Sequence, residues 1–316
     1  MKLNRQTAAP VLCALLIVSV LAGCGRSGDQ TDQRPELKKI EYTNLNDSAT
    51  RQLLENLLSG AGVSEKRVQG FFSRVEQFNG SVDAGWLTDG FEEAEPLDTK
   101  YDPYEMQDAW TAKNGTFQGY NCRITAMELF GEYVSAGDDP KINADEDVLF
   151  VDEETLKADP DALGGSSLSD FQALYSSMSA ENTTEVRRHV QTVQNVWTER
   201  GVTFRENDKL RLITVFFHDR PAGEDSMLFA GHAGVLLTDG NGALYFVEKV
   251  AFQEPYRLLR FADRIELSDY LMGKYDVSWG QDTAHPFIME NGELMEGWRP
   301  NPNGVNAAHD QGGETA

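Results

Sequence analysis

The sequence predicts an α+β fold in which a helical N-terminal part packs on a mostly antiparallel sheet. Between residues 53 and 78, apolar residues recur at spacings of three and four, which is the pattern of helices with one buried face. After Gly201 the pattern changes to short runs of strand-forming residues separated by turn signals. Helices first and strands second favour α+β over an alternating α/β architecture.

Helical segments are expected in both halves of the chain. Residues 46–48 offer N-caps before the leucines of the first helix, and Gly60 offers a stop. A second apolar stripe runs from Val68 to Phe78 and closes at Asn79. Residues 80–116 contain many Asp, Gly and Pro residues and are expected to be mainly loop. Further helices are expected from residue 122 to about 136, from about 184 to 200, and around 268–272.

The second half predicts four strands joined by short connections. Between the second and third strand, Asp239-Gly-Asn-Gly is a strong hairpin signal. A short helix after the fourth strand is expected to close the domain. The expected strands are residues 210–217, 227–237, 243–251 and 256–261.

The N-terminus predicts a targeting segment. Lys2 and Arg5 precede an apolar run that is short for a membrane span and ends at Leu21-Ala-Gly-Cys24. This tetrapeptide resembles the bacterial lipobox, in which the cysteine is lipidated. Residues 1–23 are therefore expected to be a lipoprotein signal peptide, and Cys24 is expected to anchor the chain to a bacterial membrane on the extracytoplasmic side. The alternative is an ordinary signal peptide that is cleaved nearby.

The rest of the chain divides by composition. Residues 24–38 are polar and without aromatic residues, which is typical of a flexible tether. Residues 39–299 suit a single domain, since the segment contains no repeat. Residues 300–316 are rich in Pro, Gly, Asn and Ala and are expected to form a disordered tail.

The charge balance narrows the classes of partner. The chain has 28 Lys and Arg against 51 Asp and Glu, for a net charge of -23. Such a surface repels nucleic acid and bare anionic lipid, so neither is an expected partner. The HExxH, paired CxxC, Walker and GxGxxG motifs do not occur in the sequence. No metal and no cofactor is therefore expected.

One cysteine has no expected partner in the mature chain. Cys13 would leave with the signal peptide and Cys24 would carry the lipid, which leaves Cys122 alone in an oxidising compartment. Cys122 opens a predicted helix, where free N–H groups and the helix dipole lower the pKa of a thiol. It is therefore either a reactive nucleophile or a buried cysteine that acts as a small apolar residue.

Among the five histidines, one stands in a different setting. His232 lies within GHAGVLL, between two glycines of an otherwise apolar strand. Small neighbours allow another backbone or a substrate to approach closely. A solvated or structural role is the expected one for the remaining histidines: His189, His218, His285 and His309.

The predicted hairpin provides a partner for this histidine. If residues 239–241 form a three-residue loop, Glu248 lies directly across from His232, on the same face of the sheet. A two-residue turn would shift the register by one and weaken the pairing. A carboxylate on an apolar strand face is costly unless a group pairs with it. We therefore expect Cys122, His232 and Glu248 to be nucleophile, base and orienting residue, with Gln253 as the fallback orienting residue.

An oxyanion site would need the backbone N–H of Cys122 and a side-chain donor. Gln118 and Asn121 are the candidates for that donor, and Gln118 is preferred because it precedes the nucleophile by four residues.

Two resemblances support this interpretation. GYNCRITAMELF and the distant GHAGVLLTDGNGALYFVEK resemble the papain-like cysteine hydrolases, most closely the cell-wall CHAP and NlpC/P60 branches. Nearly the whole expected mature chain, including DVLFVDEETL and VWTERGVTFRENDKL, resembles the bacterial lipoprotein family called domain of unknown function 4300. The resemblance implies a papain-like core with the three residues above as its triad. The linker of about a hundred residues between Cys122 and His232 is long for the cell-wall branches and implies at least one extra helix, and Glu248 fits the CHAP pattern better.

Two functions remain open on the sequence. The first is a cell-surface cysteine peptidase or amidase, for which cell-wall peptides are the first substrate to consider. The second is a catalytically inactive papain-like domain that binds a peptide, glycan or protein partner at the cell envelope. Transferases with the same triad and a purely structural role are further alternatives.

Overall fold

The computed structural model describes residues 37–142, 148–221, 225–278 and 280–301. The predictions for the signal peptide, for lipidated Cys24, for residues 24–36 of the tether and for residues 302–316 of the tail concern residues outside this part. Among the described residues, no helix combines the length and the apolar character that a membrane crossing needs.

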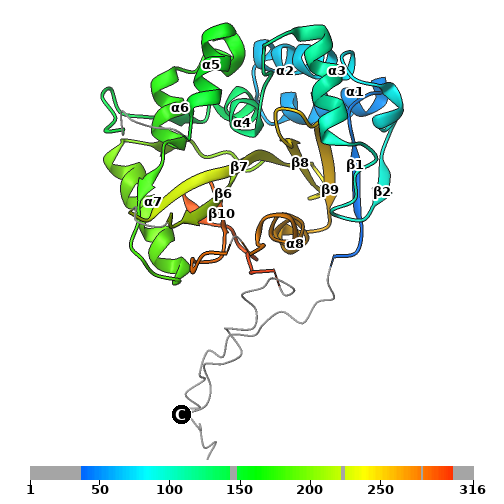
Figure 1. Cartoon of the computed structure of the whole chain (residues 1–316). Coiled ribbons are helices and arrows are strands. Elements are labelled where there is room, and N and C mark those ends of the chain that lie inside the picture. Colours follow the sequence, from blue (N-terminus) through cyan, green and yellow to red (C-terminus); the bar gives the residue numbers. More distant parts are fainter. Residues whose placement is uncertain (1–36, 143–147, 222–224, 279, 302–316) are drawn as a thin grey trace, which may run out of the picture. The chain divides into compact units, whose positions relative to one another are not determined.

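An antiparallel sheet forms the centre of the domain (Figure 1). Its strands follow the spatial order β11-β10-β6-β7-β8-β9-β1-β2, and β4 pairs with one end of β7. The strands of this sheet are β1 (Ile40–Thr43), β2 (Glu92–Ala94), β4 (Met178–Ser179), β6 (Leu210–Asp219), β7 (Met227–Thr238), β8 (Leu244–Lys249), β9 (Tyr256–Phe261), β10 (Phe287–Glu290) and β11 (Glu293–Leu294). The α+β class predicted from the sequence is confirmed.

The four predicted strands are β6 to β9, and each is found close to its expected bounds. The hairpin between β7 and β8 is also confirmed, because Thr238 pairs with Leu244 and Asp239 caps the turn by accepting from the N–H groups of Asn241 and Ala243. Strands β1, β2, β4, β10 and β11 were not predicted. They are short, and each joins a sheet that is formed by distant residues.

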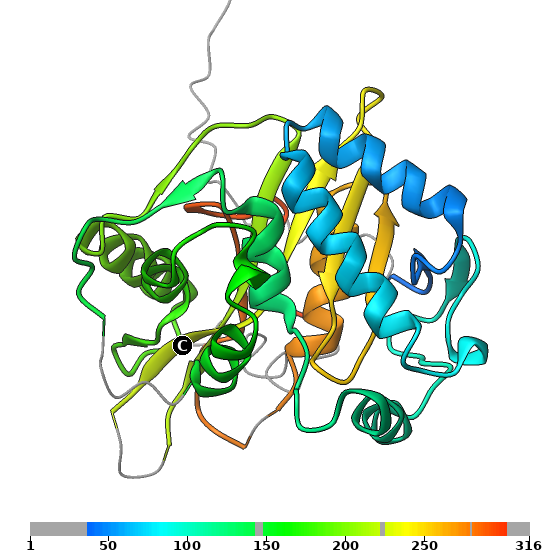
Figure 2. The ribbon, with the colours of Figure 1, turned by 90° about the horizontal axis from the view of Figure 1, so that it is seen from above.

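Helices cover one face of the sheet and bury most of the apolar residues (Figure 2). The first two, α1 and α2, lie where the sequence predicts them. Asp47 caps α1 by accepting from the N–H groups of Ala49 and Thr50. The helices before β6 are α1 (Ser48–Gly60), α2 (Glu65–Asn79), the 3-10 turn η1 (Ala84–Trp86), α3 (Pro103–Asn114), α4 (Cys122–Phe130), α5 (Phe150–Ala158), the 3-10 turn η2 (Pro160–Leu163), α6 (Leu168–Tyr175) and α7 (Val186–Glu199).

The opposite face of the sheet is covered by α8 (Arg264–Tyr275), which is longer than the helix predicted there. Asp263 caps its start by accepting from the N–H groups of Ile265 and Glu266. Leu267, Tyr270 and Leu271 pack there against apolar side chains of β7, β8 and β9. The chain does not close with this helix, because β10 and β11 follow it.

The prediction of loop for residues 80–116 was wrong, since α3 lies there. Asp102 accepts from the N–H of Tyr104, and Pro103 occupies the first turn of the helix. Proline is well suited to that position because its missing N–H would have no partner there. Pro103, which in the sequence indicates a loop, is therefore part of the first turn of α3.

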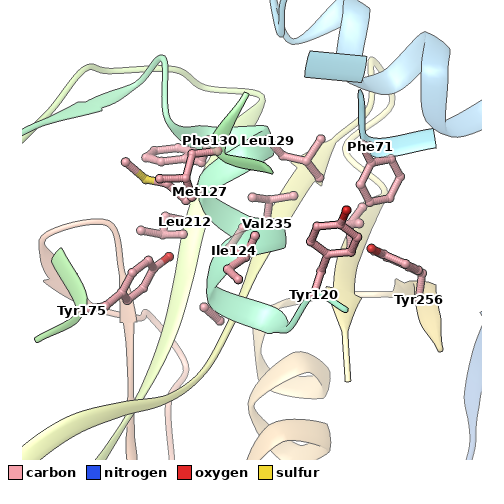
Figure 3. Packing of buried hydrophobic residues seen from close by; sticks show 14 of the residues in the cluster. Phe71, Tyr120, Ile124, Met127, Leu129, Phe130, Tyr175, Leu212, Val235 and Tyr256 are labelled. Carbon is pink, nitrogen blue, oxygen red and sulfur yellow. The ribbon is translucent and has the colours of Figure 1, made fainter. Parts of the chain in front are cut away.

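Helix α4 lies against β7 and β8 at the centre of the domain (Figure 3). Ile124 and Met127 point into the core that includes Val235 of β7. The helix ends at Phe130, earlier than predicted, where Arg67 donates to the carbonyl groups of Met127 and Glu128. Val134 lies instead in a two-stranded sheet of β3 (Val134–Ser135) and β5 (Thr203–Phe204).

Candidate functional site

Cys122 is the first residue of α4, as the sequence predicts. Asn121 caps the helix, and its side-chain oxygen accepts from the N–H of Ile124 at 3.0 Å. The first N–H groups of a helix have no partner within the helix, and with the helix dipole they favour an anion at this end. The thiol of Cys122 therefore stands where a thiolate is stabilised.

An ion pair joins this helix start to α5, and a hydrogen bond joins it to the strand that carries His232. Asp152 of α5 is fully buried and accepts from Asn121 at 2.7 Å and from Nε of Arg123 at 3.0 Å. The guanidinium of Arg123 also donates to the carbonyl of Ala230 in β7 at 2.8 Å. One buried carboxylate thus positions both the N-cap and the residue that bridges α4 to β7.

His232 lies on β7 next to an irregularity of the strand. Val215 of β6 pairs with His232 and Phe216 pairs with Ala230, so Gly231 is an extra residue in β7. Such a bulge re-aims the side chains beside it. On its other side β7 pairs with β8 only up to Gly234, which faces Glu248. His232 therefore lies just beyond the point where the two strands stop pairing.

The predicted register was wrong by two residues. Glu248 pairs with Gly234 instead of His232, because the hairpin loop spans residues 239–243. Side chains alternate with a period of two along a strand, so a shift of two preserves the face. Nε2 of His232 and Oε2 of Glu248 lie 2.7 Å apart as diagonal neighbours.

The glycines of the His232 segment make room for aromatic rings of the protein itself. A Cβ atom at Gly231 would lie 2.3 Å from the ring of Phe217, and one at Gly234 would lie 2.4 Å from the ring of Phe246. The sequence predicts that a backbone or a substrate approaches the chain closely at these glycines. In the structure, the side chains of Phe217 and Phe246 occupy that space.

Glu248 is held on both of its carboxylate oxygens. Oε2 faces His232, and Oε1 accepts from the hydroxyl of Tyr270 at 2.5 Å. Burial raises the pKa of Glu248, but the hydrogen bond and the positive charge of His232 outweigh it and lower the pKa to about 2. The residue is therefore a carboxylate at neutral pH.

The third partner is the thiol. Burial raises the pKa of Cys122, but the hydrogen bond to His232 and the charges of His232 and Arg123 outweigh burial, so that the pKa is lowered. Burial in turn lowers the pKa of His232, but its bonds to Cys122 and Glu248 raise it to about 9. Because Nε2 faces Glu248, Nδ1 remains for the sulfur. A thiolate and an imidazolium are the favoured forms of this pair.

The three predicted triad residues are thus brought together, and they are almost completely covered. Cys122 exposes 6% of its surface, His232 exposes 1% and Glu248 exposes none. The ring of Tyr275, from α8, lies 5.1 Å from the ring of His232.

Within the described residues, no hydrogen bond joins the other predicted site residues to the thiol. Gln118 is exposed, and its amide donates to the carbonyl of Thr116 at 3.4 Å. Both side-chain groups of Asn121 are engaged, one in capping α4 and one with Asp152. Gln253 lies in the loop between β8 and β9. The residue that contacts Nε2 of His232 is Glu248, so the fallback is not needed.

Sequence reasoning missed Asp152 and Tyr270, which hold the triad from outside. Asp152 stands in an acidic helix start in which nothing marks it as the buried carboxylate. Tyr270 offered a weak signal, since it is a tyrosine among the apolar residues of a helix, and a buried hydroxyl usually has a partner. Among the described residues, no three His, Cys, Asp or Glu side chains are grouped so that they could hold a metal ion.

Comparison with known protein families assigns this chain to one of them. The sequence profile of the family described as domain of unknown function (DUF4300) matches residues 41–295. The chain belongs to the DUF4300 family. Neither the curated proteins nor the solved structures contain a significant match. In this DUF4300 chain the match covers the sheet apart from Ile40, all helices named above and the Cys122, His232 and Glu248 site.

Proposed function

We propose that this DUF4300 chain is a cysteine-dependent amide hydrolase with a papain-like core. The observation that carries the proposal is the convergence of Cys122, His232 and Glu248, which lie on α4, β7 and β8. A nucleophile, a base that contacts it and an acid that orients the base are the parts that acyl transfer requires.

The reaction follows from the protonation states of the pair. The thiolate of Cys122 attacks the carbonyl carbon of an amide, and a C–S bond forms while the C–N bond breaks. His232 donates its proton to the leaving nitrogen, which departs as an amine. A water molecule then attacks the thioester while His232 accepts its proton, and the acid and the free thiolate are released.

The surroundings of His232 support this sequence of proton transfers. Glu248 faces Nε2 and therefore keeps the proton of Nδ1 directed at the sulfur and the leaving group. Tyr270 positions Glu248, and both Glu248 and His232 are buried. Burial strengthens this charge pair because the local dielectric is low.

An oxyanion would form at the start of α4. The backbone N–H of Cys122 lies in the first helical turn and can donate to it. Of the two predicted side-chain donors, Gln118 is the better candidate, because Asn121 is engaged in capping α4 and in binding Asp152.

The proposed location is the outer side of a bacterial membrane, with the lipid on Cys24 as the anchor. The lipobox-like Leu21-Ala-Gly-Cys24 supports this location. A domain tethered there faces the cell wall, so peptides of the cell wall are the first substrates to test. The net charge of -23 opposes binding to nucleic acid.

The second candidate function is a catalytically inactive domain that binds a peptide, glycan or protein. The observation that favours it is the cover over the triad, since the thiol exposes only 6% of its surface. A peptide must displace part of this cover before it can reach the sulfur.

Hydrolysis of an activated ester tests the proposal without knowledge of the natural substrate. The full chain is mixed with p-nitrophenyl acetate, and the release of nitrophenolate is followed. Acyl transfer predicts a stoichiometric burst, from the thioester on Cys122, and then steady turnover that Cys122→Ala and His232→Asn both abolish. A burst without turnover supports the inactive binding domain, and release that equals that of Cys122→Ala contradicts the hydrolase.

A further inference from the structure

Lys274 is a half-buried lysine in the last turn of α8. Within the described part of the chain its ammonium group makes no ion pair and no hydrogen bond. The contact that it does make is with the adjacent Tyr275, whose ring centre lies 5.5 Å from Nζ. A half-buried ammonium group without an acceptor is less well solvated than one on an exposed lysine.

Two other cations near Cys122 have their donors satisfied. Arg123 is paired with Asp152 at 2.6 Å and donates to backbone carbonyl groups. Lys249 is fully buried and donates to the carbonyl groups of residues 251, 252 and 254. Among the described residues Lys274 has no acceptor, although the full chain contains 51 acidic residues.

The position of Lys274 connects it to the triad. Tyr275 lies between, with its ring 5.5 Å from Nζ of Lys274 and 5.1 Å from the ring of His232. Burial lowers the pKa of Lys274 and outweighs the charges of Glu248, Glu254 and Cys122, which act in the opposite direction. One aromatic ring, that of Tyr275, thus contacts both the ammonium group of Lys274 and the imidazole of His232.

We propose that Lys274 binds a carboxylate of the substrate, next to the amide bond that Cys122 attacks. This inference rests on the proposed function and names its substrate class: peptides with a free carboxylate close to the bond that is cut. A carboxylate would supply the acceptor that Lys274 lacks and would be held by a charge-assisted hydrogen bond. A lysine in the last turn of a helix also complements the helix dipole, and such a structural role would not distinguish between ligands.

A binding experiment tests the carboxylate site independently of catalysis. The full chain carrying Cys122→Ala is titrated calorimetrically with N-acetyl-alanyl-alanine and with the amide of the same dipeptide. The free acid should bind at least about tenfold more tightly than the amide, which corresponds to roughly 1.4 kcal/mol. Adding Lys274→Gln should abolish the difference, and adding Lys66→Gln, an exposed lysine of α2, should preserve it.

Alkylation of Cys122 provides a second readout in the chain with its thiol intact. The ratio of the rates with iodoacetate and with iodoacetamide is read by mass spectrometry of the Cys122 peptide. Lys274→Gln should lower this ratio about fivefold or more, because a nearby positive charge attracts the anionic reagent.

The outcomes separate the two proposals. Equal affinity for acid and amide, or a preference that survives Lys274→Gln, overturns the carboxylate site. A preference that depends on Lys274, in a chain that shows no ester turnover, leaves the carboxylate site standing and removes the hydrolase.

Discussion

The buried histidine at the candidate site and a buried histidine pair elsewhere in the domain differ in what faces their ring nitrogens. His232 lies between the carboxylate of Glu248 and the thiol of Cys122, and its pKa is raised to about 9. His189 of α7 and His218 of β6 stack on each other with ring centres 4.3 Å apart. Burial lowers the pKa of both, and the charge of His189 adds to the effect at His218, whose pKa falls to about 4.

The difference lies in the partners of the rings and not in their depth. Nε2 of His189 binds the carbonyl of Thr183, and Nδ1 of His218 accepts from the N–H of Ala284. Within the described residues the other nitrogen of each ring has no partner. Glu181 raises the pKa of His189 and Asp219 raises that of His218, but neither reverses the effect of burial, and the charge of Arg220 adds to that effect at His218. Burial alone keeps an imidazole neutral, and facing anions make it an imidazolium.

The largest effect is expected when the carboxylate beside His232 loses its charge. Glu248→Gln preserves the shape of the side chain but removes the anion that keeps His232 protonated. The steady rate of ester hydrolysis at neutral pH should fall about 100-fold or more, as for loss of acid–base catalysis.

Glu254→Gln is the matched control for this change. Glu254 accepts from the hydroxyl of Tyr101 at 2.8 Å and does not contact His232. Its variant should keep the rate within about threefold, because its carboxylate binds Tyr101 and makes no hydrogen bond to His232 or Cys122 among the described residues. Equal losses in both variants would show that the charge of Glu248 has no special role.

The second prediction concerns stability in acid. The folded-state pKa of His218 lies below its ordinary value of 6.5, so the folded protein binds fewer protons than the unfolded chain. The stability that this histidine contributes is full above pH 6.5 and is lost as the pH falls towards about 4. His218→Asn should reduce the acid loss of unfolding free energy by roughly 1–3 kcal/mol, measured by denaturant titration at several pH values.

The sign is reversed for His232. The pKa of His232 is raised to about 9. The stability that His232 contributes is therefore full below pH 6.5 and is lost as the pH rises through about 9. His232→Asn should therefore change the alkaline side of the stability profile. A His218→Asn profile that parallels the wild type in acid would contradict the contrast between the two groups.

The smallest effect is expected from the hydroxyl that holds Glu248. Tyr270→Phe removes one donor from the carboxylate, which raises the pKa of Glu248. The acid limb of the ester-hydrolysis profile should move to higher pH, and stability should fall by about 1 kcal/mol.

Tyr175→Phe is the control for stability, since the buried hydroxyl of Tyr175 has no hydrogen-bond partner among the described residues. Removing it should cost little or be stabilising. A Tyr270→Phe variant that loses stability without a change in its pH profile would indicate that Tyr270 only fills space.

Local sequence predicted the parts of the fold that local physics determines. Caps and apolar periodicity identified α1, α2, α7 and the start of α4, and turn residues identified the β7–β8 hairpin. The sequence did not predict β1 or β10, because short edge strands depend on partners far along the chain.

The candidate site was predictable as a set of residues and not as a geometry. Cys122, His232 and Glu248 were identified from the helix start, the small neighbours and the parity of the strand. The bulge at Gly231 and the longer loop at residues 239–243 changed the register, but strand parity kept Glu248 on the face of His232. Asp152 and Tyr270 reach the site through tertiary packing, which no local pattern encodes.

Nuclear magnetic resonance of the imidazole nitrogens tests most directly whether facing anions hold His232 protonated. The full chain is labelled with ¹⁵N-histidine, and signals are assigned with His232→Asn and His218→Asn. His232 should remain protonated through neutral pH and titrate near 9, while His218 stays neutral until the pH approaches 4. Cys122→Ser should lower the pKa of His232 and leave that of His218 unchanged. A neutral His232 at pH 7 in the wild type, titrating like His218, would contradict the account.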